Sequence, residues 1–381
     1  MSSERLGVYL DHAATGPVRA SVVDAMSAVW SDQWANPAAA HRRGRDARRT
    51  LDDARERLAD VLGVAAADVV VTSGGTEADN QAITGAVVAT GGVAVCSAAE
   101  HHAVLDPVMH SGGVVVRCRE DAHIDLDALA DALDRAQAHQ PVAVVSVMAV
   151  NNEVGTITDL DAVAAVIRRH APGAWFHCDA VQAATWLDMA DMCRVADMVS
   201  LSAHKFGGPH SVGALVVRNG VSPAPLLLGG GQERGRRSGT VDVAGVVGMS
   251  TALADAAAER AEVVARVNEL RNRLLDMISV VDGVAPTVAP QATVPGICHV
   301  CVEGVESEAL LFMLDTAGIA ASAASACASG AMQASHVTAA MGVPPSRARG
   351  ALRLSLGRTT TADDIERAGE VLVDVIARLR R

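Results

Sequence analysis

Residues 67–90 read ADVVVTSGGTEADNQAITGAVVAT, and they place a short apolar run, a glycine turn and a helical pattern in direct succession. The apolar run has the length and the β-branched content of a buried strand. Further apolar runs alternate with helical patterns as far as residue 218. This alternation predicts a doubly wound α/β domain, in which helices cover a mostly parallel, seven-stranded sheet.

The expected strands and helices follow from the same pattern. Strands are expected over residues 67–73, 92–98, 113–118, 142–150, 174–180, 196–202 and 212–218. Helical spacing occurs over residues 41–63, 77–90 and 161–171. In the first of these, Leu51, Ala54 and Leu58 share one face, as in an amphipathic helix.

After residue 240 the pattern changes. Residues 242–278 form a long helical stretch that we expect to be broken once. Beyond it, the expected elements are a strand over 297–302, a helix from Ser307, a strand over Ala351–Leu356 and a closing helix from Thr361. The pattern predicts a large domain of residues 17–255 and a smaller α+β domain of residues 1–16 and 256–381.

Composition narrows the class of protein. The chain has 381 residues, 50% of them hydrophobic, which excludes disorder and allows two cores. Its formal net charge of -12 argues against broad attraction to nucleic acid or anionic membranes, so we expect small molecules and proteins as partners. The start has no signal-peptide pattern and no stretch has the apolar length of a membrane span, which predicts a cytoplasmic protein.

Seven cysteines, at positions 96, 118, 178, 193, 298, 301 and 327, lack the spacing of a disulfide framework and indicate a reducing compartment. Cys298 and Cys301 form a CxxC pattern, which also occurs in metal and redox sites. They lie in an apolar run typical of a strand, whose alternation points the two thiols to opposite faces. We therefore expect two buried thiols there, and no metal site.

Polar side chains follow several expected strands at their carboxyl ends, where open α/β sheets bind ligands. Lys205 follows strand 196–202, in surroundings that would desolvate its amine and lower its pKa. Asp179 closes strand 174–180, where a buried carboxylate needs a cation, although it could instead cap the next segment. A lysine binds an aldehyde cofactor as a Schiff base and an aspartate keeps a pyridine nitrogen protonated, so the pair indicates pyridoxal 5'-phosphate.

His101 and Asn152 follow two further strands. One imidazole of the pair His101 and His102 could stack on a cofactor ring and move protons, although a solvated turn is the alternative for both. The Asn152 amide could reach the cofactor or a substrate carboxylate.

Three segments offer donors to a phosphate. Gly75 and Thr76 lie at an expected helix N-terminus, whose free amides bind anions, although an ordinary strand-to-helix connection has the same pattern. Ser202 and His204 come directly before the lysine, and Thr240 ends the loop GGGQERGRRSGT.

Arg353 and Cys327 each have two interpretations. Alternation in the strand GALRLSLG places Arg353 on one face, where it either looks into the site and binds a carboxylate or faces solvent. Cys327 lies in the small-residue run ASAASACASGAMQAS, either as an accessible nucleophile on a loop or as a buried residue of a helix.

Ten motifs occur in order along nearly the whole chain: YLDHAATGP, NPAAAH, TSGGTEADN, EHHAVL, NNEVG, DAVQ, SAHKFGGP, GGGQERGRRSGT, SACASG and RLSLGR. With them the sequence resembles the cysteine desulfurases, which are pyridoxal phosphate enzymes of fold type I in the aminotransferase class V superfamily. The run around Cys327 is similar in length to that of the group whose catalytic cysteine lies on a long mobile loop. His12, Gly75 and His210 depart from the commonest residues of the family.

The resemblance implies that Lys205 binds the cofactor covalently, that Asp179 pairs with its ring nitrogen and that His101 stacks on the ring and acts in acid-base steps. The other implied cofactor contacts are Gln182, Gly75, Thr76, Ser202, His204, Asn152 and, from the neighbouring subunit of a homodimer, Thr240. The substrate carboxylate would be held by Asn152 and Arg353.

The implied reaction converts L-cysteine to L-alanine. The Cys327 thiolate would take the substrate sulfur as a persulfide and pass it to an acceptor protein. Similar enzymes serve iron-sulfur clusters, tRNA thiolation and DNA phosphorothioation. The chain ends at VLVDVIARLRR, where housekeeping members continue into a tail, which favours a dedicated pathway such as DNA phosphorothioation. The alternatives are a selenocysteine lyase, a class V aminotransferase and a noncatalytic sulfur-relay scaffold.

Overall fold

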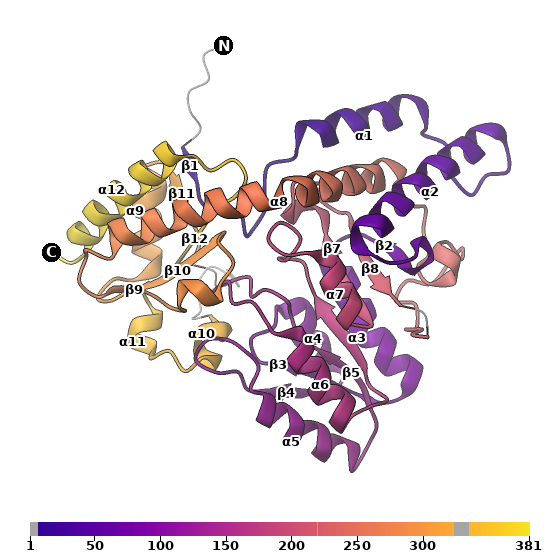
Figure 1. Ribbon diagram of the computed structural model, residues 1–381, viewed down its shortest axis with the longest axis horizontal. Helices are drawn as coiled ribbons and strands as arrows, with labels where there is room; N and C mark the ends of the chain where they lie inside the picture. Colours follow the sequence, from indigo (N-terminus) through magenta and orange to yellow (C-terminus); the bar gives the residue numbers. More distant parts are fainter. Residues whose placement is uncertain (1–6, 219, 324–334) are drawn as a thin grey trace.

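The computed structural model describes residues 7–218, 220–323 and 335–381 (Figure 1). Seven strands form one sheet in the order β2-β8-β7-β6-β5-β3-β4. Their bounds are β2 (Val69–Thr72), β3 (Val93–Ser97), β4 (Val114–Val116), β5 (Val142–Ser146), β6 (Trp175–Asp179), β7 (Met198–Ser202) and β8 (Gly213–Val217). β8 runs antiparallel to both of its neighbours, and the other pairings are parallel. Each strand lies within an expected range, so the predicted sheet is confirmed.

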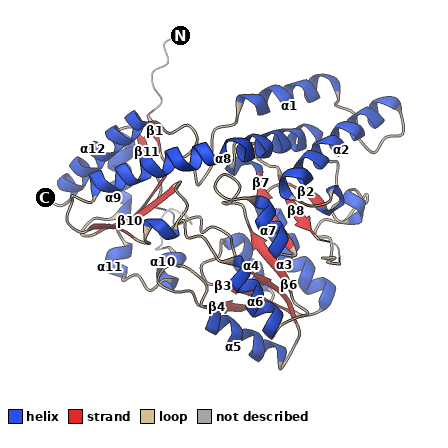
Figure 2. Cartoon of the chain, viewed as in Figure 1, coloured by secondary structure: helices blue, strands red, loops and turns tan. Residues whose placement is uncertain are grey.

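Helices cover both faces of this sheet (Figure 2). On one face lie α3 (Gly75–Thr90) and α4 (His102–His110). On the other face lie α2 (Arg42–Leu62), α5 (Leu126–Gln137), α6 (Leu160–His170) and α7 (Met189–Val195). Cover on both faces explains why the strands are continuous apolar runs rather than alternating ones. The doubly wound α/β fold is therefore confirmed.

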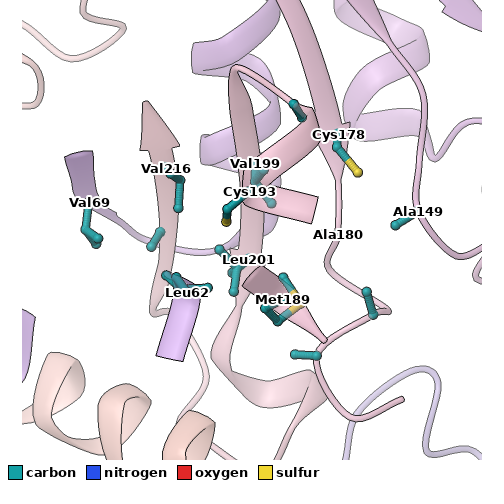
Figure 3. Close-up of a cluster of buried hydrophobic side chains, with 14 of the residues drawn as sticks. Leu62, Val69, Ala149, Cys178, Ala180, Met189, Cys193, Val199, Leu201 and Val216 are labelled. Carbon is teal, nitrogen blue, oxygen red and sulfur yellow. The ribbon is translucent and has the colours of Figure 1, made fainter. Parts of the chain in front are cut away.

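Figure 3 shows part of the core between the sheet and α2 and α7. Leu62 of α2 and Met189 of α7 lie in one buried cluster with Val199 and Leu201 of β7. Burial of each such side chain stabilises the fold by about 1.5–3 kcal/mol. The packing holds β7 in place, and the polar residues at its carboxyl end are held with it.

α8 (Val243–Ile278) is one continuous helix of 36 residues, so the expected break is wrong. No glycine or proline occurs between residues 249 and 278, where alanine, the best helix former, is frequent. Gly248, near the start of α8, lies against α1 (Ala20–Asp32), since a Cβ there would be 2.7 Å from the Met26 sulfur. Close packing rather than a bend explains this glycine.

A second, smaller core surrounds a three-stranded antiparallel sheet in the order β12-β10-β9. α8 contributes Leu253 to the large core and Leu270 to this one, so a single helix joins them. The elements here are β1 (Val8–Tyr9), β9 (Val284–Pro286), β10 (Ile297–Val302), α9 (Ser307–Thr316), β11 (Ile319–Ala320), α10 (His336–Ala340), α11 (Pro345–Ala348), β12 (Ala351–Ser355) and α12 (Ala362–Leu379). The expected strands and helices are confirmed, while the residues at which the two domains divide stay a prediction.

The six cysteines that the structure describes are all buried, including Cys298 and Cys301 of the CxxC pattern. The Cys301 sulfur lies 3.5 Å from the Thr287 hydroxyl oxygen, and Cys298 packs in the smaller core. Within the described ranges, no three His, Cys, Asp or Glu side chains are grouped as a metal site requires. No helix in that same part of the chain is long and apolar enough to cross a membrane.

Candidate active site

A cavity of about 610 Å³ lies at the carboxyl ends of the central strands, where the large sheet meets the smaller core. The side chains predicted for the site that line it are Gly75, Thr76, His101, Asn152, Asp179, Gln182, Ser202, His204, Lys205 and Arg353. Those from the large sheet come together because the carboxyl ends of its parallel strands meet at one edge, and Arg353 joins them from β12 of the smaller sheet.

Two predicted residues are not among them. Thr240 is exposed and does not line the cavity of its own chain. Cys327 lies in residues 324–334, outside the described residues.

Lys205 enters the cavity at the end of a short 3-10 turn, Ala203–Lys205, that follows β7. Its Nζ donates to the backbone oxygens of Ala13 at 2.6 Å and Ala14 at 2.9 Å. Desolvation, together with the positive charge of Arg353, lowers the pKa of the amine to about 8. Near neutral pH, a usable part of this amine is therefore unprotonated and nucleophilic.

Asp179 ends β6 and is buried. Its Oδ1 accepts a hydrogen bond from the Val181 amide at 2.9 Å, as a helix N-cap would. However, turns rather than a helix follow Asp179, so it does not cap a helix. Burial raises the pKa of the Asp179 carboxyl, and the Val181 amide, His101 and Lys205 oppose that rise. Among the described residues, no Lys, Arg or His forms an ion pair with it, so this carboxylate lacks a cation.

His101 caps the N-terminus of α4, with Nδ1 accepting from the Ala103 amide at 3.0 Å. Desolvation lowers the pKa of this imidazole, which favours the neutral form. Because Nδ1 is the acceptor, the proton of the neutral ring lies on Nε2. His101 therefore lines the cavity as a neutral imidazole that can give or take a proton.

Gly75 and Thr76 begin α3, whose first amides have no partner within the helix. A Cβ on Gly75 would lie 2.6 Å from Val181 Cγ2, which explains why this chain has glycine at this position. Nearby, His204 Nδ1 lies 3.2 Å from the Thr15 hydroxyl, and burial, together with the neighbouring Lys205 amine and His210 ring, lowers the pKa of His204 to about 4. A helix N-terminus, hydroxyls and a neutral imidazole form a set of donors suited to a phosphate.

Arg353 faces the cavity and is buried, so the solvent-facing alternative for its strand is wrong. Its Nη2 donates to Asp11 Oδ1 at 2.8 Å, and its Nη1 donates to the Asn152 backbone oxygen at 2.9 Å. Arg353 Nε and Asn152 Oδ1 are buried and have no hydrogen-bond partner. The free Nε–H of Arg353 is a donor suited to a ligand carboxylate, whereas the Asn152 oxygen can only accept a hydrogen bond.

Gln182 uses its Nε2 to donate to the Ala13 oxygen at 2.7 Å. The segment from Asp11 to Thr15 thus contacts Arg353, Gln182, Lys205 and His204 in turn. The motif YLDHAATGP is evident in the sequence, but the sequence did not predict that this segment would form hydrogen bonds with four side chains of the site.

Sequence reasoning also missed three buried acids that line or adjoin the cavity: Asp79, Glu100 and Glu153. Burial and the charge of Asp179 raise the pKa values of Asp79 and Glu100 well above the ordinary range. Asp79 Oδ1 has no hydrogen-bond partner and lies 3.6 Å from His177 Nε2. Burial therefore favours the protonated form of both side chains.

Position in the motifs was the available signal for these acids. Asp79 lies one helical turn after Thr76, Glu100 directly precedes His101, and Glu153 directly follows Asn152. Their burial depends on packing that no local pattern encodes.

The fold and this cavity define a doubly wound α/β enzyme with a lysine at the carboxyl edge of its sheet. The sequence profile of the aminotransferase class-V family matches residues 8–368. The chain is 42% identical to an IscS-like cysteine desulfurase of Mycobacterium tuberculosis over 98% of this chain and 97% of that relative. This protein therefore belongs to the cysteine desulfurases of the aminotransferase class V family, whose members depend on pyridoxal 5'-phosphate.

Solved structures agree. A NifS-like protein superimposes with a TM-score of 0.89 at 30% identity, over 98% of this chain and 99% of that one. The structure of SspA in complex with cysteine gives a TM-score of 0.78 at 27% identity, over 93% and 99%.

Proposed function

We propose that this protein binds pyridoxal 5'-phosphate at Lys205, converts L-cysteine to L-alanine and keeps the sulfur as a persulfide on Cys327 for an acceptor protein. The observation that carries the proposal is the pairing of Lys205, with a lowered pKa, and Asp179, a buried carboxylate without a cation, in one cavity. The solved structure of a similar protein with cysteine supports the choice of substrate.

The residues present fit this cofactor. Lys205 supplies the amine for its aldehyde, and Asp179 supplies the carboxylate for a protonated ring nitrogen. The start of α3, with Thr76, and the side chains of Ser202 and His204 supply donors for its phosphate. When bound, the cofactor supplies an electron sink for the α-carbon of the substrate.

The side chains of this chain would share the remaining work. Arg353 would hold the substrate carboxylate through its free Nε, with the Asn152 amide beside it. His101 and the Lys205 amine would carry protons to and from the substrate, since both have pKa values lowered by desolvation. The proposed role of Cys327 as the sulfur acceptor rests on its position in the SACASG motif.

A homodimer would complete the phosphate site. Thr240 is exposed and away from its own cavity, as a residue that reaches a neighbouring subunit must be. Its loop is tied to the start of α3 by an ion pair between Arg237 Nε and Glu77 Oε1 at 2.9 Å. Close by in sequence, Leu228 is 84% exposed, which a partner subunit would cover.

The acceptor is proposed to be a protein thiol, since persulfide sulfur moves by thiol attack. The pathway and the cytoplasmic location stay predictions, with DNA phosphorothioation, iron-sulfur cluster assembly and tRNA thiolation as the pathways. Trapping the thiol that receives sulfur from the persulfidated protein would identify the pathway.

The test uses the purified holoenzyme with L-cysteine, and it measures L-alanine together with persulfide mapped to individual cysteines. Wild type should form alanine and a persulfide on Cys327 alone, because the six described cysteines are buried. Cys327→Ser should abolish the persulfide, and Lys205→Ala should abolish turnover. Cys118→Ser is the matched control and should keep both products.

Each rival has its own result. Alanine formation that requires an added keto acid would indicate a transaminase, and turnover of selenocysteine alone would indicate a selenocysteine lyase. A protein that binds the cofactor but releases no alanine would be a noncatalytic relay, and the proposal would be wrong.

A further inference from the structure

The Thr15 hydroxyl lies between two imidazole rings beside the proposed phosphate site. His204 Nδ1 is 3.2 Å from Thr15 Oγ1, and His210 Nε2 is 3.0 Å from the same oxygen. The two rings stack, with their centroids 5.4 Å apart and their planes 28° from parallel. One hydroxyl thus joins a ring that lines the cavity, His204, to a ring that does not, His210.

Backbone geometry holds both rings in place. The Gly16 amide donates to the His204 backbone oxygen at 3.1 Å. Ser211, directly after His210, has a φ of 59°, in the left-handed region that residues other than glycine rarely adopt. Such strain persists only where the surrounding structure imposes it, and it is frequent at functional sites. The loop therefore holds His210 at a cost in strain, which points to a role for its position.

The donors and acceptors of this cluster can be counted from His204 outward. Burial, with the charges of Lys205 and His210, lowers the pKa of His204 to about 4, so near pH 7 its neutral ring has a single N–H. Its Nε2 makes no hydrogen bond to any described residue, which leaves that nitrogen for a ligand in the cavity. A phosphate anion offers only acceptors, so it binds this ring when the ring proton is on Nε2.

That tautomer fixes the rest of the cluster. With its proton on Nε2, His204 must accept at Nδ1, so the Thr15 hydroxyl donates its one proton there. Thr15 Oγ1 can then only accept from the second ring, so His210 Nε2 must be an N–H donor. His210 is exposed, so its other ring nitrogen can exchange a proton with water and the ring can adopt this form. In such a row, each hydrogen bond strengthens the next one.

We infer that His210 is a positioning residue for the cofactor phosphate: through the Thr15 hydroxyl, it keeps the proton of His204 on Nε2, where the ring can donate to that phosphate. The inference rests on the proposed function. The reverse order, in which His204 donates to Thr15 and Thr15 donates to His210, would present a lone pair to the anion and repel it.

The first test locates the His204 proton in the cofactor-free protein at about pH 8. It compares His210→Lys, His210→Gln and His210→Glu. Lysine can only donate, glutamine can donate, and glutamate has the shape of glutamine but can only accept. With nitrogen-15-labelled histidine, NMR should find the His204 proton on Nε2 in wild type, His210→Lys and His210→Gln, and on Nδ1 in His210→Glu.

The second test measures the Kd values for inorganic phosphate and for pyridoxal 5'-phosphate. Both should stay within about threefold of wild type in His210→Lys and His210→Gln. In His210→Glu both should rise about tenfold or more, as expected when a hydrogen bond to a charged group is lost. Titration in about 0.5 M salt limits direct repulsion between the new carboxylate and the phosphate. His139→Glu, at another exposed histidine, is the matched control and should leave both Kd values unchanged.

Thr15→Val separates the relay from the direct effect of charge. Valine removes the hydroxyl through which His210 acts on His204. In the Thr15→Val background, the Kd values of His210→Glu and His210→Gln should therefore lie within about threefold of each other. A direct effect of charge would leave their ratio as it is in the presence of Thr15.

The inference is overturned if the His204 proton lies on the same nitrogen in His210→Glu and His210→Gln, if the two variants bind inorganic phosphate equally well, or if Thr15→Val leaves their Kd ratio unchanged. A wild-type protein that binds inorganic phosphate but not pyridoxal 5'-phosphate would instead refute the proposed function itself.

Discussion

Replacing Gly75 by alanine should weaken cofactor binding. A Cβ at this position would lie 2.6 Å from Val181 Cγ2 and 3.4 Å from Ser202 Cβ. The backbone of Val181 is held, since its amide donates to Asp179 Oδ1 at 2.9 Å. Relief of the contact therefore requires the Val181 side chain to leave its rotamer, or it displaces the start of α3, which offers donors to the phosphate, or the carboxylate proposed to face the ring nitrogen.

The size of the effect follows from the crowding. Overpacking costs about 1–3 kcal/mol, and alanine regains at most about 1 kcal/mol of helix propensity. Without cofactor the helix start can shift and relieve the strain, whereas bound cofactor requires the original geometry. The strain therefore falls mainly on the bound state, and the Kd for pyridoxal 5'-phosphate should rise roughly 5- to 150-fold.

The assay is an absorbance titration of the cofactor-free protein, with Val181→Ala as the control. Val181→Ala removes the Cγ atoms that the new Cβ would meet. The double variant Gly75→Ala with Val181→Ala should therefore bind the cofactor with a Kd within about threefold of that of Val181→Ala alone. Wild-type affinity in Gly75→Ala, or a double variant no better than Gly75→Ala, would refute the steric reasoning.

Three other substitutions test the remaining site. Asp79→Asn should become more stable relative to wild type as pH rises from 5 to 8, by up to about 1.4 kcal/mol per pH unit. The reason is that Asp79 has a higher pKa in the folded protein than in the unfolded chain, so rising pH ionises it first in the unfolded chain and destabilises wild type alone. The same stability difference in urea unfolding at both pH values would contradict this. With saturating cofactor, His101→Gln should lose about 10²- to 10⁴-fold in alanine formation, and a loss below tenfold would remove His101 from the proton steps. Arg353→Lys should lower kcat/KM for L-cysteine by roughly tenfold or more. A lysine cannot offer a third nitrogen to the carboxylate in the geometry of a guanidinium whose Nη atoms are fixed on Asp11 and the Asn152 backbone. An unchanged kcat/KM would place the carboxylate elsewhere.

The positions of Lys205, Asp179, His101 and Asn152 at one cavity were predictable from the sequence. Each follows an apolar run of strand length, and the topology of a parallel sheet brings such positions to one edge. The prediction needed no knowledge of side-chain packing, which explains its success.

The position of Arg353 was harder to predict, because strand alternation assigns its side chain to one face of the strand but does not say whether that face contacts the cavity or solvent. The structure answers the question: β12 turns Arg353 toward Asp11 and the Asn152 backbone. Likewise, Gly75 looked like a simple departure from the family until Val181 was found 2.6 Å from its missing Cβ.

The sequence by itself determined the sheet, the helices that cover it and the strand-end chemistry, because periodicity and strand ends are local properties of the chain. Only the tertiary structure decided how burial acts on the acids of the site, since it raises the pKa values of Asp79 and Glu100 well above the ordinary range. It alone also placed Ser335 on Glu153, across 182 positions of the chain. Both outcomes depend on burial and on contacts between distant segments, and burial and long-range contact are properties of the packed molecule rather than of any one stretch of residues.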